Sequence, residues 1–210
     1  MKKLLFLVLL MPVLAFAQKP GKTKGGTKTS TFKGGLTSST LLFQSQANEP
    51  VQMKFKSDFS LGYQFDFYAG RVMSFSFGLG LQNAGAVTHY FTQRVNYDLT
   101  YISANTGPSF HIPIGRSSDI QFGGTVYGQY LAAATQEGGN LYIDLLREGY
   151  LENYDVGFGL NAGLRLQAGF SSAIVLQAEY MQGLLDIEKH ASQQLYNTLF
   201  NFHFGYQFIF

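Results

Sequence analysis

The chain has 210 residues and no cysteine, which excludes a disulfide framework, a thiolate metal site and a lipid-anchored N-terminal cysteine. Charged residues make up 13% of the chain, against about 25% in an ordinary soluble domain, and aromatic residues reach 16%. Of 15 basic residues two lie in the first three positions, and the other 13 are balanced by 13 acidic ones, so charge gives no reason to expect a nucleic-acid partner.

The first 17 residues have the pattern of a cleaved signal peptide. Two lysines precede an apolar stretch over 4–16, and Ala15-Phe16-Ala17 fits the small-x-small cleavage site. This stretch is shorter than the roughly 20 residues that a membrane-spanning helix needs. Residues 18–31 contain four lysines and no large apolar residue, so we expect a flexible basic lead in the periplasm.

Residues 32–210 are predicted to form one β-barrel domain, because apolar residues recur there with a period of two. In the segment 55–68 one face is apolar and the other polar. The apolar face has Phe59, Leu61, Tyr63, Phe65 and Phe67, and the polar face has Asp58, Ser60, Gly62, Gln64 and Asp66. The segment 73–82 repeats the pattern after a short turn, which predicts a hairpin.

Two predicted strands are less regular. In 33–45 the run Leu41-Leu42-Phe43 breaks the alternation, and the strand is inferred from its position and from the need for an even strand count. In 97–112, Leu99 lies on the opposite face from Ile102. Pro108 lacks a backbone N–H there, so we expect a β-bulge.

Four clearer strands follow, and their apolar positions lie on one face. They include Ile120, Phe122, Val126 and Tyr130; Val156, Phe158, Leu160, Leu164 and Leu166; Ile174, Leu176, Ala178 and Tyr180; and Phe200, Phe202, Phe204, Tyr206, Phe208 and Phe210. The sequence therefore predicts an all-β, eight-stranded, antiparallel, up-and-down transmembrane barrel. Short and long connections alternate, and since short turns are periplasmic in such barrels, both chain ends are expected in the periplasm.

The inward face predicts a filled lumen, because eight strands enclose space only for side chains. The charged and titratable positions expected to form a polar network there are Asp58, Asp66, Asp155, Arg165, Glu179 and His203. Seven glycines are also expected to face inward, either for close packing or to leave space for water: Gly62, Gly78, Gly80, Gly157, Gly159, Gly163 and Gly205.

The segments YQFDFYAGRVMSFSFGLGL, YISANTGPSFHIPIG, GGTVYGQYLAA, YDVGFGLNAGLRL and FHFGYQFIF resemble, in this order, the small outer-membrane β-barrel family of Bacteroidota called PorT-like. The resemblance covers most of residues 32–210. It implies a barrel and an outer-membrane location, and it implies no reaction and no list of functional residues. One departure is the interruption of the fourth strand by Ser103, Asn105, Thr106 and Pro108.

Two further sets of residues are candidate recognition elements. The C-terminal aromatic face of Phe204, Tyr206, Phe208 and Phe210 resembles the signal that the barrel-assembly machinery reads in outer-membrane barrels. The loop 136–153 is too apolar to be fully solvated, so either its flanking strands extend and pack beyond the membrane, or it is a contact surface. The residues of this surface are Leu141, Tyr142, Leu145, Leu146 and Tyr150.

These patterns predict a structural or interaction role in the outer membrane, with lipid and the assembly machinery as partners and an envelope protein as a further one. The alternatives are a narrow selective pore and a barrel hydrolase acting on lipid or peptide through a Ser/His/acid arrangement. No two histidines have metal-motif spacing, and no cofactor, metal site or catalytic residue is predicted.

Overall fold

The computed structural model describes residues 26–45, 50–90, 93–114, 117–139, 141–189 and 193–210. The predicted signal peptide and residues 18–25 of the predicted lead lie outside these ranges. In the described ranges ten strands form a single antiparallel sheet. No helix among the described residues is long and apolar enough to cross a membrane.

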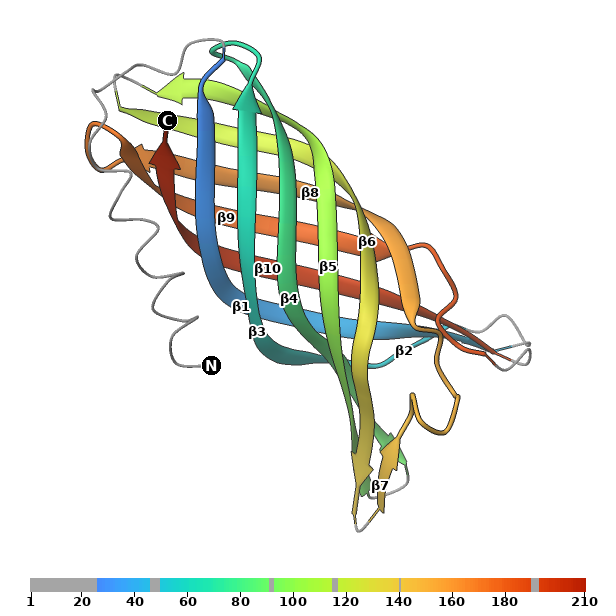
Figure 1. Cartoon of the computed structure of the whole chain (residues 1–210). Coiled ribbons are helices and arrows are strands. Elements are labelled where there is room, and N and C mark those ends of the chain that lie inside the picture. Colours follow the sequence, from blue (N-terminus) through green and yellow to red (C-terminus); the bar gives the residue numbers. More distant parts are fainter. Residues whose placement is uncertain (1–25, 46–49, 91–92, 115–116, 140, 190–192) are drawn as a thin grey trace, which may run out of the picture.

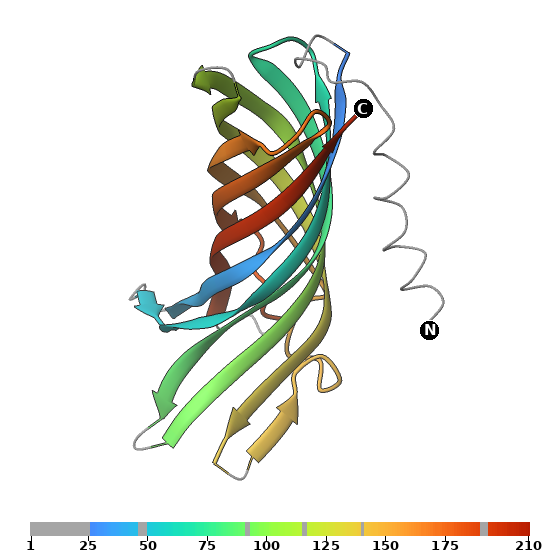
Figure 2. The same cartoon turned by 90° about the vertical axis from the view of Figure 1, so that its left-hand side faces the viewer.

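Eight long strands close into a ring, which confirms the predicted barrel (Figures 1 and 2). They are β1 (Lys28–Ser45), β3 (Lys54–Tyr68), β4 (Met73–Tyr90), β5 (Gln93–Ile114), β6 (Ser118–Gly138), β8 (Tyr154–Gln167), β9 (Ser172–Gly183) and β10 (Gln193–Ile209). Each pairs with the next ring strand along the chain, and β10 closes the ring on β1. The short strands β2 (Pro50–Gln52) and β7 (Leu141–Asp144) pair with β1 and β6.

The strand registers are staggered around the ring. Residue pairs that start at Ser30 and pass once through all eight strands return to β1 at Thr40, ten residues farther along. Such a stagger tilts the strands by about 35–45° and closes every edge. A closed ring pairs the backbone groups that lipid cannot satisfy.

Strand β1 begins earlier than the sequence pattern predicted. Thr29 and Thr31 are buried inside the ring, and Thr29 to Thr31 pair with both β3 and β10. The predicted boundary between the lead and the barrel at residue 32 is therefore four residues too late, because Lys28 is already in the strand. Thr29, Ser30 and Thr31 are all small and polar, so no alternation of apolar and polar residues marks the start of this strand.

The predicted outward and inward faces are confirmed in the strands that alternate clearly. Phe59, Leu61 and Phe67 are exposed on the outside, whereas Ser60 and Asp66 are buried within the ring. An apolar outer surface with a polar interior reverses the arrangement of a soluble protein. It is the arrangement expected when lipid surrounds the outer wall.

The ladder around Pro108 differs from the expectation. The pairs Thr106–Val126 and Ser109–Gly123 keep one register, so Pro108 interrupts the hydrogen-bonded ladder between β5 and β6 without adding a residue. The predicted bulge at Pro108 is therefore wrong. The register shifts instead between Thr100 and Tyr101, where Ala132 on β6 is left over.

The interior has two chemically different halves. Near the start of β1 and the end of β10, called here the termini end, it is polar. Toward the long connections, called the loop end, it is filled by apolar side chains that include Leu41, Leu99 and Tyr101. These inward apolar residues explain why the alternation in β1 and β5 looked irregular, since both faces of the strand are apolar there.

Several connections that looked like long loops are strands that continue beyond the ring. β5 has 22 residues and β6 has 21, about twice the 9–11 that cross a bilayer, whereas β9 has 12. The strands β4 to β7 consequently project to one side at the loop end (Figures 1 and 2). This projection is called the lip.

Candidate functional site: the lumen and its loop-end cap

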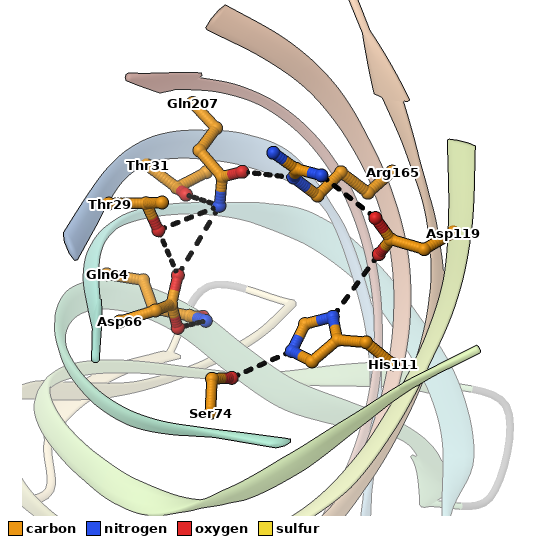
Figure 3. Close-up of polar contacts among 9 residues, drawn as sticks. All are labelled: Thr29, Thr31, Gln64, Asp66, Ser74, His111, Asp119, Arg165 and Gln207. Carbon is orange, nitrogen blue, oxygen red and sulfur yellow. Dashed lines mark hydrogen bonds and ion pairs between the residues drawn. The ribbon is translucent and has the colours of Figure 1, made fainter. Parts of the chain in front are cut away.

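A chain of hydrogen bonds crosses the lumen at the termini end (Figure 3). Asp66 accepts hydrogen bonds from Thr29 at 3.0 Å and from Gln64 at 2.7 Å. The amide nitrogen of Gln207 donates to Thr29 and Thr31, both at 3.1 Å, and to Asp66 at 3.4 Å. Asp66 thus accepts hydrogen bonds from three side chains, which is the condition under which a buried carboxylate is tolerated.

Arg165 continues the chain across the barrel. Its Nε donates to Gln207 Oε1 at 2.6 Å, and its Nη1 donates to Asp119 Oδ2 at 2.9 Å. The other carboxylate oxygen of Asp119 lies 3.2 Å from His111 Nδ1, and His111 Nε2 lies 2.8 Å from Ser74 Oγ. If Nδ1 carries the proton and donates to Asp119, Nε2 accepts from the Ser74 hydroxyl, so all these groups are satisfied.

The network reaches all eight ring strands. The residues above lie on β1, β3, β4, β5, β6, β8 and β10. Lys33 on β1 donates to Gln64 at 3.1 Å and to Gln177 on β9 at 3.2 Å, which adds the last strand. A hydrogen-bond network that reaches every strand ties the wall together from within.

The middle of the lumen is polar and nearly full. Ser60 Oγ lies 2.8 Å from His203 Nε2, and Asn201 accepts from Thr37 at 2.9 Å and from Gln82 at 3.1 Å. A cavity of about 30 Å³ remains, with Glu179 and His203 in its lining. That volume holds about two water molecules, and it is far too small for a nutrient.

The inward glycines serve close packing, the first of the two roles considered. A Cβ at Gly157 would clash with the Tyr127 hydroxyl and with the backbone carbonyl of Gln182, so the absence of a side chain permits close packing there. Gly78 and Gly80 line the small central cavity, yet a Cβ there would clash with the Asn105 side chain and with the backbone carbonyl of Leu61.

The six predicted lumen residues do not form one network. Asp66 and Arg165 belong to the termini-end network, while Glu179 and His203 lie at the central cavity. Asp155 is buried nearer the loop end, accepts from Gln129 at 2.8 Å and keeps its Oδ1 without a partner.

Asp58 lies at the loop end of β3, where it pairs with Lys56 at 3.1 Å; Lys56 also contacts Asp98. This partly exposed group is separate from the lumen network, so the prediction of Asp58 as a member of that network is wrong. Its position on the inward face was correct, but the tilt of the strand carries it toward the rim.

Sequence reasoning missed the residues that connect the network. His111, Asp119 and Gln207 supply its central links, and each alternates with an outward apolar residue: Ile112, Ile120 and Phe208. The alternation therefore predicts that these three residues point inward. It does not predict which inward residues meet across the barrel.

Ser74, His111 and Asp119 have the connectivity of a hydrolase triad. Three features oppose that role. Ser74 is 1% exposed and lines none of the described cavities, Asp119 also forms an ion pair with Arg165, and the Tyr68 ring lies 4.9 Å from the His111 ring, centroid to centroid. A nucleophile needs open space beside its oxygen, so the arrangement favours a structural part of the network.

The segment 141–153 forms a cap over the loop end. Leu145 N donates to Ala134 O at 2.9 Å, Leu131 N donates to Asn153 O at 2.7 Å, and Glu152 N donates to Ile187 O at 2.8 Å. These backbone bonds hold the segment against β6 and against residues 186–188. The interpretation that this region extends and packs beyond the wall accounts for much of its apolar character.

The predicted contact surface is therefore divided. Leu145 and Leu146 pack toward the apolar interior, and Tyr150 lines a cavity while 43% of it stays exposed. Leu141 and Tyr142, at 58% and 64% exposure, point to solvent on the lip. As a single exposed patch of five residues the prediction is wrong. The physical reason is that the cap folds back to cover the open mouth of the barrel.

The C-terminal aromatic residues lie on β10 next to the start of β1. Phe204 and Phe210 are exposed on the outer wall, Tyr206 and Phe208 are in ring contact at 4.9 Å between centroids, and Phe210 N donates to Lys28 O at 2.8 Å. This strand closes the ring. Its role as an assembly signal stays a prediction.

Among the described residues, no group of three His, Cys, Asp or Glu side chains could hold a metal ion. Asp66 and Asp119 instead accept hydrogen bonds from neighbouring side chains of the network. The geometry thus provides a sealed polar interior at one end and an apolar cavity under a cap at the other.

No protein-family model and no curated protein sequence matches the chain. Solved structures with a similar fold include the outer membrane protein OprG from Pseudomonas aeruginosa, with a TM-score of 0.53, 10% identity and coverage of 88% of this chain and 98% of OprG. Neisserial surface protein A has a TM-score of 0.49, 10% identity and coverage of 87% and 98%. Ail of Yersinia pestis has a TM-score of 0.45, 14% identity and coverage of 89% and 100%. The likeness to OprG, together with the closed ring of eight antiparallel strands, shows the fold of the small outer-membrane β-barrel proteins.

Proposed function

We propose that this chain is an integral outer-membrane protein of the PorT-like kind that acts through its exposed loop-end surface, in a structural or interaction role, and not by transport through its lumen. The observation that carries this proposal is the hydrogen-bond network that joins all eight strands across the termini end. The central cavity beyond it, of about 30 Å³, supports a lumen that is shut to nutrients.

The outer wall supports membrane insertion. Large apolar side chains are exposed on several neighbouring strands, among them Phe59, Leu79, Ile102 and Phe202. On a soluble barrel such a continuous apolar surface would drive aggregation. In a bilayer the same surface is buried in hydrocarbon.

The lip supports an interaction role. It extends beyond the length that the bilayer requires, and it presents Leu141 and Tyr142 to solvent. Aromatic side chains on a rigid β-hairpin make contacts with little loss of conformational entropy. The proposed partner is another protein of the cell envelope.

The test combines conductance with crosslinking in cells. The protein in planar bilayers is expected to show no reproducible conductance steps, and a photo-crosslinking phenylalanine analogue at Tyr142 is expected to give a discrete protein adduct. The matched control is the same analogue at the lipid-facing Val126, which should give none. Conductance steps together with no adduct at Tyr142 would favour the narrow pore instead.

A further inference from the structure

A cavity of about 270 Å³ lies at the loop end between the cap and the ring. Leu41, Leu99 and Leu195 form its ring side, and Leu145 and Leu151 come from the cap. The other lining residues are Phe43, Met53, Tyr97, Gln136, Ile143, Tyr150 and Glu188. The cavity is thus enclosed by segments from both halves of the chain and exists only once the cap has folded.

The cavity has a closed floor. Leu41, Leu99 and Leu195 belong to the same buried apolar cluster as Tyr101, Leu131 and Leu199, which fill the lumen below. The polar lumen with its network lies beyond that cluster. A molecule in the cavity can therefore enter and leave at the loop end, and it has no continuation through the barrel.

The lining selects an apolar occupant. Eight of its side chains are Leu, Ile, Met or Phe, and none of its described side chains is cationic. An apolar cavity of about 150 Å³ is sufficient for benzene. A cavity of 270 Å³ is a little under twice that volume, so a molecule of two fused rings fits.

The lining also selects a neutral occupant. A ligand carboxylate would lose its hydration among the apolar side chains, and the described lining residues include no cation that could pair with it. Neutral molecules meet no such cost. We propose that the loop-end cavity is a binding site for a small, neutral, apolar molecule of about the size of a two-ring aromatic hydrocarbon, taken up from the side of the long connections.

The methionines provide a direct test with internal controls. The chain has five, of which two lie in the first 17 residues; the barrel has Met53 in the cavity lining, Met73 on the outer wall and Met181 buried in the lumen. The full barrel with 13C-labelled methionine methyl groups is placed in lipid nanodiscs and titrated with naphthalene. The ring current should shift the Met53 methyl saturably and leave Met181 in place, while Met73 reports on naphthalene dissolved in the lipid.

Two Leu→Phe substitutions distinguish binding in the cavity from binding on the exposed lip. Leu145→Phe fills the cavity and should weaken binding by at least about tenfold. Leu141→Phe, on the exposed lip, should change it less than about twofold. Heat-dependent gel mobility verifies that each variant is a folded barrel, and if Leu145→Phe fails to fold, Phe43→Trp fills the cavity from the ring side.

A charged probe tests the choice of ligand class. Naphthalene-2-carboxylate should bind at least about tenfold more weakly than naphthalene, because its charge would lose hydration in the apolar lining. Equal, non-saturating shifts of Met53 and Met73 would overturn the proposal, and so would unchanged binding in a folded Leu145→Phe barrel. These results do not depend on conductance or on crosslinking at Tyr142, so the site and the proposed function can fail separately.

Discussion

Arg165 Nε on β8 donates to Gln207 Oε1 on β10 at a distance of 2.6 Å, although β9 lies between these two strands in the ring. The contact therefore crosses the lumen and does not follow the wall. Together with the ion pair from Arg165 to Asp119, it connects β6, β8 and β10. Arg165 is therefore the centre of the termini-end network.

Arg165→Met should lower the free energy of unfolding by about 3 kcal/mol, because it leaves Gln207 and Asp119 buried without their donor. The control Arg71→Met, in an exposed turn, should change it by less than about 0.5 kcal/mol. The chain has no tryptophan, so urea unfolding in lipid vesicles is followed by circular dichroism. Equal midpoints for the two variants would show that the network contributes little to stability.

Ser74 is expected to be unreactive because it is buried and its hydroxyl is occupied by His111. A fluorophosphonate probe should not label the folded protein. Ser74→Ala should lower the free energy of unfolding by about 1–2 kcal/mol, since it leaves His111 Nε2 without a donor. Labelling that disappears in Ser74→Ala would instead support the hydrolase alternative.

Two buried aspartates should respond in opposite directions to the same substitution. Asp66 accepts hydrogen bonds from three side chains, so Asp66→Asn replaces an acceptor with a donor that faces other donors and should lower the thermal midpoint. Asp155 has one oxygen without a partner, so Asp155→Asn removes a poorly satisfied charge and should raise the stability by about 1 kcal/mol. Loss of stability in both variants would mean that the charge on Asp155 is well compensated.

Deletion of Phe210 should lower the amount of protein in the outer membrane sharply. The side chain is 48% exposed, so its loss costs less than the roughly 1.5–3 kcal/mol of a fully buried side chain, and a large effect would reflect recognition. The control is His203→Gln, which keeps a polar group beside Ser60 and should assemble normally.

Both variants are measured in outer-membrane fractions of cells that lack the proteases that clear stalled barrels. Normal accumulation of the Phe210 deletion together with loss of His203→Gln would contradict the assembly role. It would show instead that the lumen contacts limit assembly.

Strand identity could be predicted because it depends on neighbours in the chain. In 59–67 and 200–206 each apolar residue alternates with a small or polar one, and the structure places the two sets on opposite faces. The irregular strands were harder for a local reason: Leu41 and Leu99 face an apolar interior at the loop end, so the polar half of the pattern is missing there.

The sequence by itself determined that this chain forms a closed ring of amphipathic strands, because a period of two and paired backbone groups are properties of each strand and its neighbour. Only the tertiary structure decided that Arg165 meets Asp119 and Gln207, that Asp58 falls outside the network, and that the segment 141–153 closes the mouth. The physical reason is the stagger of ten residues around the ring. This stagger sets the height of every inward side chain in the lumen. It is the sum of eight strand registers, so it cannot be worked out from any single segment of the sequence.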